Sequence, residues 1–291
     1  MAGATRKTSQ RPVKVVIDSG ADIPPDIAAG LDITIIPLLV HIGGKTYQDG
    51  VDISGQAFYE ELEATRSVTT TSLPSLDALT QAYRRLTGDG YDVVSIHISS
   101  KLSGTFNAAL MASTADGVPP EAVAVVDSRS LSMAHGWVAI RAAEAAREGK
   151  SLDEVEEIAN RASSRVGLFG ALDTLEYVVR SGRLGKLPGT VGNMLNIKPI
   201  LTVRPGGDAA IIERLRSSEK ALARIVELTA EQQPLERLAI LHGANEKGAD
   251  LLLSMLQPLN PPQPVVTGHI GAVLGTHLGP GAVGVCFLRA E

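Results

Sequence analysis

Short β-branched runs alternate with helix-length segments through the first half of the chain, and this alternation constrains the fold more than any other feature. The expected strands are 13–17, 33–40, 93–98 and 123–126. The segments between them have helical spacing and polar starts, at 54–64, 75–86, 104–113 and 131–147. Strands separated by helices of this length predict βαβ units and a mostly parallel sheet. The strands are near-continuous apolar runs, which is typical of a sheet covered on both faces.

A second α/β region follows. Ser151 and Glu154 form a capping box that opens a helix to about Arg165, close to the expected domain border. Beyond it comes an apolar segment at 166–172, and we expect strands at 197–203, 209–215, 238–242, 264–269 and 282–288, and helices at 175–180, 217–231 and 246–256. The turn at 205–207 predicts a hairpin between the first and second of these strands.

The 291 residues therefore predict an α/β fold of two domains. We place an N-terminal parallel-sheet βαβ domain at 13–160 and a smaller C-terminal α/β domain at 161–291, after a disordered tail at 1–12.

Composition excludes several classes of protein. The chain has 27 Lys and Arg against 32 Asp and Glu and no basic run after residue 20, which argues against a nucleic-acid partner. Its one cysteine, Cys286, lies in an apolar run and reads as a small core residue in a reducing compartment. No apolar segment of a signal peptide follows residues 1–12, and the uncharged stretch 257–288 is interrupted by prolines and glycines. We expect a cytoplasmic protein.

Hydroxyl-rich loops mark the most promising place for a ligand, because ligands of open parallel sheets bind at the carboxyl ends of the strands. Four such loops precede predicted helices, at 18–22, 69–75, 99–105 and 127–130. Small donors beside helix starts suit an anionic head such as a carboxylate or phosphate. Ser103-Gly104-Thr105 is the most suggestive, since Gly104 allows close backbone approach between two hydroxyls. The alternative is that these residues are ordinary N-caps.

Two further features carry chemistry. His277 lies in an expected Gly/Pro loop, 275–281, where it suits anion binding or proton transfer, with a structural histidine as the alternative. Arg180, Arg183 and Lys186 place three cations in seven residues. They suit a phosphate or an acidic partner, or they complement the dipole of an exposed helix C-terminus.

The signatures of several enzyme classes are missing. The chain has no GxxxxGK[ST] loop, no GxGxxG after the first strand, no GxSxG elbow, and neither HExxH nor CxxC. We therefore expect no cofactor and no metal. Ser103, Asp127 and His277 could still converge as a hydrolase triad, which leaves one catalytic alternative open.

A resemblance to a known family rests on an ordered set of motifs. These motifs are Asp18-Ser-Gly-Ala-Asp22, Thr71-Ser-Leu-Pro-Ser75, Ser99-Ser-Lys-Leu-Ser-Gly-Thr105, Asp127-Ser-Arg-Ser130, Leu175-Glu-Tyr177 with Ser181-Gly-Arg-Leu-Gly185, Leu195-Asn-Ile-Lys-Pro-Ile-Leu201 and His277-Leu-Gly-Pro-Gly281. Together, over about residues 13–288, they resemble the DegV family of bacterial fatty-acid-binding proteins.

The resemblance implies a long-chain fatty acid held between the two domains. Members of the FakB type present the fatty-acid carboxylate to a separate fatty-acid kinase, which forms an acyl-phosphate for phospholipid synthesis. It follows that the chain is a non-catalytic lipid carrier, whose partners are the fatty acid, the kinase and, transiently, a membrane surface.

Site residues follow from the matched motifs. Thr71 and Ser103 resemble the carboxylate ligands and His277 a third head-group contact. The neighbouring residues in the same motifs, Ser72, Gly104 and Thr105, complete the expected carboxylate site. Arg183 resembles a head-group or kinase-facing residue, and Arg216 a residue that docks the kinase.

Two positions depart from the family pattern. Leu73 stands where the family has Gln, and Ser217-Ser218 where it is usually more basic. The second departure bears on kinase partnership more than on lipid binding. The alternatives to a carrier are a serine hydrolase that acts on a lipid or ester through Ser103 and His277, and a regulatory protein that senses a lipid.

Overall fold

The computed structural model describes residues 11–183 and 197–291. The expected tail at 1–12 falls outside these ranges except for Arg11 and Pro12. Lys186 and the first two residues of the motif at 195–201 also fall outside them.

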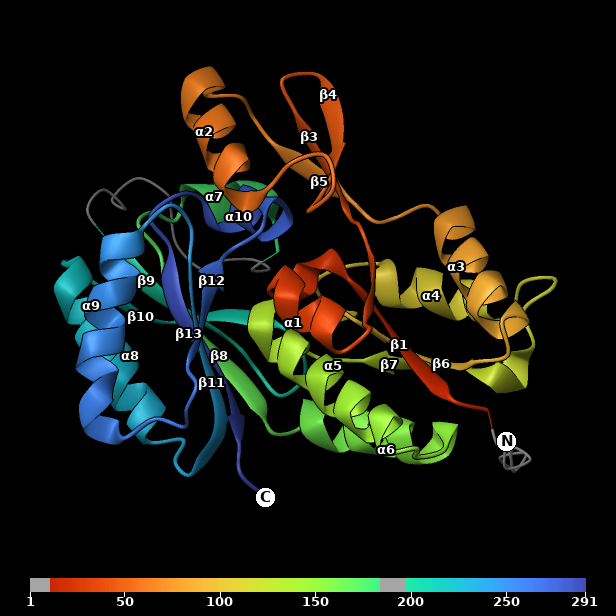
Figure 1. Ribbon diagram of the computed structural model, residues 1–291. Coiled ribbons are helices and arrows are strands. Elements are labelled where there is room, and N and C mark those ends of the chain that lie inside the picture. Colours follow the sequence, from red (N-terminus) through yellow and green to blue (C-terminus); the bar gives the residue numbers. More distant parts are fainter. Residues whose placement is uncertain (1–10, 184–196) are drawn as a thin grey trace.

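The predicted parallel sheet is confirmed. Its strand order is β2-β1-β6-β7, with every neighbouring pair parallel. The bounds are β1 (Val13–Asp18), β2 (Thr34–Ile36), β6 (Asp92–His97) and β7 (Val123–Asp127). Helices α3 (Leu76–Gly88) and α4 (Thr105–Ser113) cover one face of this sheet (Figure 1). Every residue of β6 is buried, as expected for a central strand covered on both sides.

A mixed six-stranded sheet forms the second layer, in the order β10-β9-β8-β13-β11-β12. Only β11 and β12 are parallel neighbours; the other pairs are antiparallel and include the predicted β9–β10 hairpin. Helices α8 (Ser218–Ala230) and α9 (Glu246–Leu256) cover its outer face (Figure 1). The strands are β8 (Val166–Ala171), β9 (Lys198–Val203), β10 (Ala209–Leu215), β11 (Leu235–His242), β12 (Val266–His269) and β13 (Val283–Arg289).

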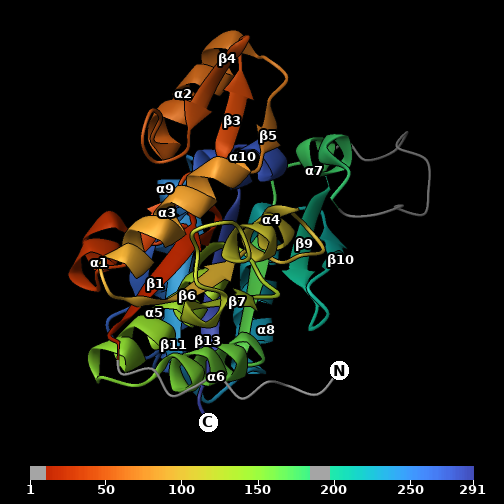
Figure 2. The same ribbon diagram turned by 90° about the vertical axis from the view of Figure 1, so that its right-hand side faces the viewer.

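Helix α5 (Ser132–Arg147) lies between the two sheets, beside α6 (Leu152–Ser163), which opens with the predicted capping box (Figures 1 and 2). It contacts β1 and β6 on one side and β8 and β13 on the other. A helix in this position must be apolar around its whole circumference. Most of α5 meets that demand, with many alanines that allow both sheets to approach closely, whereas the charged Arg141, Glu144 and Arg147 of its C-terminal half are not buried.

Two side chains of α5, separated by one residue, bond to both sheets. His135 Nε2 donates to the carbonyl of Ile96 in β6 at 3.0 Å, and Trp137 Nε1 donates to the carbonyl of Cys286 in β13 at 3.1 Å. Cys286 is buried, as its apolar surroundings in the sequence predict.

A small antiparallel sheet was not expected. It has the order β4-β3-β5 and lies with α2 (Gly55–Thr65) at the top of Figure 1. The single strand predicted at 33–40 is wrong, because the chain breaks around Pro37, which has no N–H for a ladder bond. Its second part joins the small sheet. The bounds are β3 (Leu39–Ile42), β4 (Lys45–Gln48) and β5 (Thr70–Ser72), so the predicted loop at 69–75 contains a strand.

The segment around His277 was also predicted wrongly as a loop. It contains the helix α10 (Ala272–Leu278), with His277 in the last turn. Gly275 reads as a helix breaker, but a Cβ there would lie 2.7 Å from Tyr59 Oη and 2.8 Å from Phe58. The glycine therefore allows α10 to pack tightly on α2. The remaining helices are α1 (Pro25–Gly30) and α7 (Glu176–Ser181).

Asp18 connects the ends of two parallel strands. Its Oδ1 accepts from Gly20 N at 3.0 Å, and its Oδ2 lies 3.0 Å from His97 Nδ1 and accepts from Ile98 N at 2.9 Å. Burial alone would raise the pKa of this carboxyl, but His135, His97 and the Ile98 N–H together lower it below its ordinary value. Asp18 thereby holds the end of β6, from which the loop with Ser103 departs.

We expect Asp18→Ala to lower the free energy of unfolding by about 3 kcal/mol or more, because three buried donors lose their acceptor. Urea denaturation followed by circular dichroism measures this loss. Asp89→Ala is the matched control, since Asp89 is exposed, and we expect a change within about 0.5 kcal/mol. Equal effects of the two substitutions would contradict the role of Asp18.

Candidate ligand cavity

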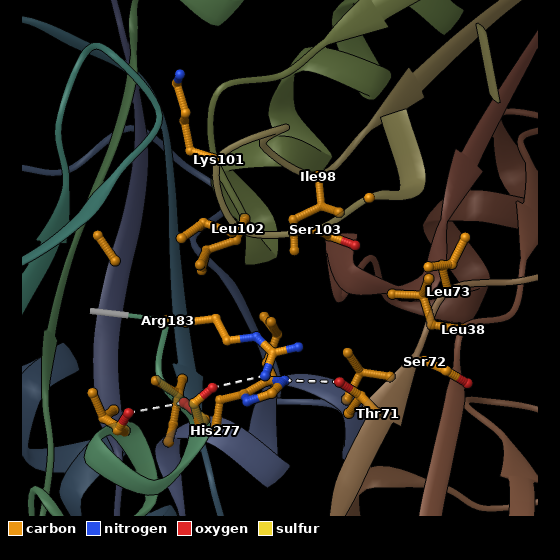
Figure 3. Close-up of a pocket in the computed structure, with 18 of the residues that line it drawn as sticks. Leu38, Thr71, Ser72, Leu73, Ile98, Lys101, Leu102, Ser103, Arg183 and His277 are labelled. Atoms are coloured by element: carbon orange, nitrogen blue, oxygen red, sulfur yellow. Dashed lines mark hydrogen bonds between the residues drawn. The ribbon is translucent and has the colours of Figure 1, made fainter. Parts of the chain in front are cut away.

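One cavity brings together most of the predicted site residues. Its volume is about 380 Å³, within the range of small-molecule sites. Its lining comes from β5, the loop before α4, α7, β9, β10 and α10 (Figure 3). Most of that lining is apolar. The apolar side chains are Leu38, Leu73, Ile98, Leu102, Leu131, Val178, Leu201, Ala209, Val273, Leu274 and Leu278.

Thr71 and His277 form the most informative polar contact of this cavity. Thr71 Oγ1 lies 3.0 Å from His277 Nε2, and His277 Nδ1 is buried without a hydrogen-bond partner (Figure 3). A neutral imidazole and a hydroxyl carry one polar hydrogen each, and their mutual bond uses only one of them. Whichever tautomer is present, one donor remains for a ligand.

Burial and the nearby Arg183 lower the pKa of His277 to about 4. The imidazole is therefore neutral at pH 7. The Arg183 guanidinium supplies the positive charge instead. It also lines the cavity, where its Nη1 donates to the carbonyl of Ser181 at 2.7 Å, and it reaches toward His277 (Figure 3).

Ser103 lines the cavity from the loop before α4, with Gly104 beside it as the N-cap of that helix. The Ser103 hydroxyl lies 2.8 Å from Thr105 Oγ1 and accepts from Thr105 N at 3.3 Å. When the Thr105 hydroxyl donates to Ser103, the Ser103 hydrogen is free to donate into the cavity. Thr105 itself is fully buried and does not line the cavity.

Two other predicted site residues, Ser72 and Arg216, have different surroundings from Thr71, Ser103 and His277. Ser72 lines the cavity, but its Oγ lies 3.0 Å from His41 Nε2 in the small sheet. Arg216 is exposed, follows β10 and does not line the cavity. Leu73, at a position where a polar residue was expected, adds an apolar side chain to the wall.

Two buried carboxylates hold the start of α10, the helix that carries His277. Asp22 Oδ1 accepts from Gly271 N at 2.9 Å, and Asp49 Oδ1 accepts from Ala272 N at 3.0 Å. Burial raises the pKa of Asp22 to about 7 and that of Asp49 to about 6. Asp49 carries no recognisable motif in the sequence, because it lies in a loop after β4 that is distant from α10 in the chain.

The hydrolase triad does not form. His277 Nε2 bonds Thr71, while Asp127 accepts from the backbone N–H of Arg129 at 2.8 Å. The cavity therefore has a serine without a general base.

A different Ser-His-Asp relay lies inside the core. Ser95 Oγ is 2.8 Å from His97 Nε2, and His97 Nδ1 is 3.0 Å from Asp18. All three side chains are fully buried, and Tyr83 Oη donates to Ser95 Oγ at 2.7 Å. A substrate has no access to this serine, so the relay is structural. Its members could not be found by sequence motif, because Ser95 and His97 lie in β6 and Asp18 lies far from them in the chain, at the end of β1.

Within residues 11–183 and 197–291, no three His, Cys, Asp or Glu side chains gather where they could hold a metal ion. In the same ranges, no helix has the length and apolar character needed to cross a membrane.

The fold and the cavity define a class: an α/β protein with a parallel and a mixed sheet around a central helix, and an internal apolar cavity with donors among its lining. The chain belongs to the DegV family, whose model matches residues 12–290. A DegV domain-containing protein of Streptomyces coelicolor is 35% identical over 280 residues, which cover 94% of this chain and 98% of that protein.

Solved structures agree. A fatty-acid-binding DegV family protein from Thermus thermophilus superposes with a TM-score of 0.87 at 29% identity, covering 96% of this chain and 100% of the other. DegV from Bacillus subtilis, described as a fatty acid binding protein, gives a TM-score of 0.84 at 32% identity, with 96% and 99% covered.

The low pKa of His277 predicts a pH-dependent contribution to stability in the ligand-free protein. Between its ordinary value of 6.5 and about 4, the unfolded chain binds a proton at this residue that the folded chain does not. The free energy of unfolding of wild type should therefore fall relative to His277→Gln as the pH falls through this window, and then level off.

Paired urea titrations of the two proteins measure the difference. Asp22 and Asp49 titrate in both proteins, so their contributions cancel. A difference that stays constant across the window would contradict the assignment.

Proposed function

We propose that this protein binds a long-chain fatty acid, with the carboxylate at Thr71, Ser103 and His277 and the tail in the apolar part of the cavity. The observation that carries the proposal is the Thr71–His277 pair, which keeps one unused donor in a cavity whose lining is mostly apolar. Arg183 adds a positive charge for an anionic head. The fatty-acid-binding relatives from Thermus thermophilus and Bacillus subtilis support the choice of ligand.

The free energies of tail burial and of carboxylate binding show that the two ends of the ligand have different roles. Burying a sixteen-carbon tail at about 0.8 kcal/mol per methylene is worth on the order of 12 kcal/mol before ordering costs. A hydrogen bond to a carboxylate contributes about 1.5 to 3 kcal/mol. The tail therefore supplies most of the affinity, and the donors determine which end of the ligand lies at His277.

The proposed role is that of a non-catalytic carrier. It would present the carboxylate to a separate fatty-acid kinase for acyl-phosphate formation, with Arg183 or the exposed Arg216 facing that partner. We propose a cytoplasmic protein that takes up the fatty acid during transient contact with a membrane surface. In this proposal the two domains meet near residue 160, and the cavity takes lining residues from both sides of that border.

Removing a head-group donor should weaken retention of fatty acid. We expect Thr71→Val and Ser103→Ala each to raise the dissociation constant of a long-chain fatty acid about tenfold, which corresponds to one lost hydrogen bond to a charged group. Titration of delipidated protein with a fluorescent fatty acid measures the constant.

Ser72→Ala is the matched control, because Ser72 follows Thr71 directly but its hydroxyl bonds His41. We expect its affinity to stay within about twofold of wild type. Unchanged affinity in Thr71→Val and Ser103→Ala would contradict the site assignment.

The absence of a base at Ser103 predicts no hydrolase chemistry there. We expect a fluorophosphonate probe to leave Ser103 unlabelled under conditions that label a serine esterase added to the same tube. Peptide mass spectrometry identifies any modified residue, and labelling of Ser103 that disappears in His277→Gln would restore the hydrolase interpretation.

A further inference from the structure

We propose that a second, smaller cavity receives the methyl end of the acyl tail, and that Gly170 limits how long that tail can be. This inference rests on the proposed function. The smaller cavity, which we call the deep chamber, has a volume of about 40 Å³ and lies against β8, β13 and the start of α5. A water molecule takes up about 30 Å³ in the liquid, so the chamber has room for roughly one methyl-sized group.

The deep chamber adjoins the main cavity. Leu131, Leu201 and Leu278 line both of them. These three side chains come from the N-cap of α5, from β9 and from the end of α10. In this proposal, an acyl chain whose head lies at His277 passes between these three apolar side chains to enter the chamber.

The lining of the deep chamber is almost entirely apolar. Apart from Ser132 and Cys286, its lining side chains are hydrocarbon or glycine. Ser132 Oγ donates to Asp22 Oδ2 at 2.7 Å, so this hydroxyl is satisfied elsewhere. The pKa of the buried Cys286 thiol is raised to about 12 by burial, so this sulfur carries no charge at neutral pH. Such a space excludes water and suits a terminal methyl group.

Gly170 faces this chamber because side chains alternate along β8. Leu168 packs into the central core with α5, whereas Phe169 and Ala171 pack into the core under α8 and α9. Gly170 shares the face of Leu168 and is paired with Gly284 of β13. The two glycines leave the floor of the chamber without side chains.

Gly170 and Gly284 differ in whether the surrounding structure has room for a Cβ. A Cβ at Gly284 would lie 2.6 Å from the carbonyl of Phe169, so that glycine is required by the backbone. A Cβ at Gly170 would meet only Leu201, at 3.7 Å, an ordinary contact, and its φ is not positive. The backbone therefore accepts a side chain at Gly170, which would fill space beside Leu201.

Two substitutions of opposite sign test the inference. Gly170→Ala should shorten the preferred acid, and Leu201→Ala should lengthen it. Each protein is delipidated, equilibrated with an equimolar mixture of saturated fatty acids of graded length, and analysed by native mass spectrometry. For each methylene displaced from the chamber, we expect the ratio of the longer to the next shorter bound acid to change about fourfold.

Gly88→Ala is the control, because it adds a methyl group to an exposed helix end with no neighbour within 4 Å. It should leave the length distribution unchanged. Thermal unfolding of all variants shows whether each is folded at the temperature of the experiment, and Gly170→Val provides a larger plug in the same direction as Gly170→Ala.

The outcomes separate this inference from the proposed function. Opposite shifts in Gly170→Ala and Leu201→Ala support the deep chamber as the end of the tail site. An unchanged distribution in both, or an equal loss of all lengths in Gly170→Ala, overturns the inference while wild-type binding leaves the proposed function standing. A wild-type protein that binds none of the acids overturns both.

Discussion

The position of helix α5 between two sheets is the constraint on which the rest of the structure depends. A single turn of the helix places His135 against β6 and Trp137 against β13, so one rigid element determines the spacing of both layers. Buried bonds of this kind are costly to leave unmade, which makes the arrangement specific as well as stable. The residue that begins the helix, Leu131, lines both cavities. The contacts that hold α5 between the two sheets therefore also determine the space that is left for a ligand.

The polar end of the cavity is assembled from segments far apart in the chain. Thr71 belongs to a short strand of the small sheet, and His277 to a helix whose start is held by Asp22 and Asp49. Ser103 depends on the end of β6, which Asp18 holds through Ile98. Each donor is thus positioned by a buried carboxylate or a strand pairing, and the cavity walls need only supply apolar surface.

The sequence predicted the parallel sheet, the β9–β10 hairpin and the capping box well, because these features depend on local periodicity and local turn chemistry. Motif order also predicted a site at Thr71, Ser103 and His277, and all three residues line one cavity. The sequence missed α10, since the reason for Gly275 is its contact with Tyr59, which no local pattern reveals. The buried relay through Ser95 and His97 and the pairing of Gly170 with Gly284 escaped for the same reason: both are products of strand register.

The place of β13 within the six-stranded sheet has a consequence for biosynthesis. This strand follows the other five in the chain, yet it lies between β8 and β11. During synthesis β8 is made before β9, β10, β11 and β12, and its edge toward β13 stays unpaired until β13 has been made after them. In the parallel sheet, β1 gains its second partner β6 after a shorter stretch of chain, once β2, β3, β4 and β5 have been made. The nascent chain therefore passes through a stage in which the parallel sheet is complete while the facing edges of β8 and β11 still lack β13. Unpaired strand edges of this kind favour aggregation.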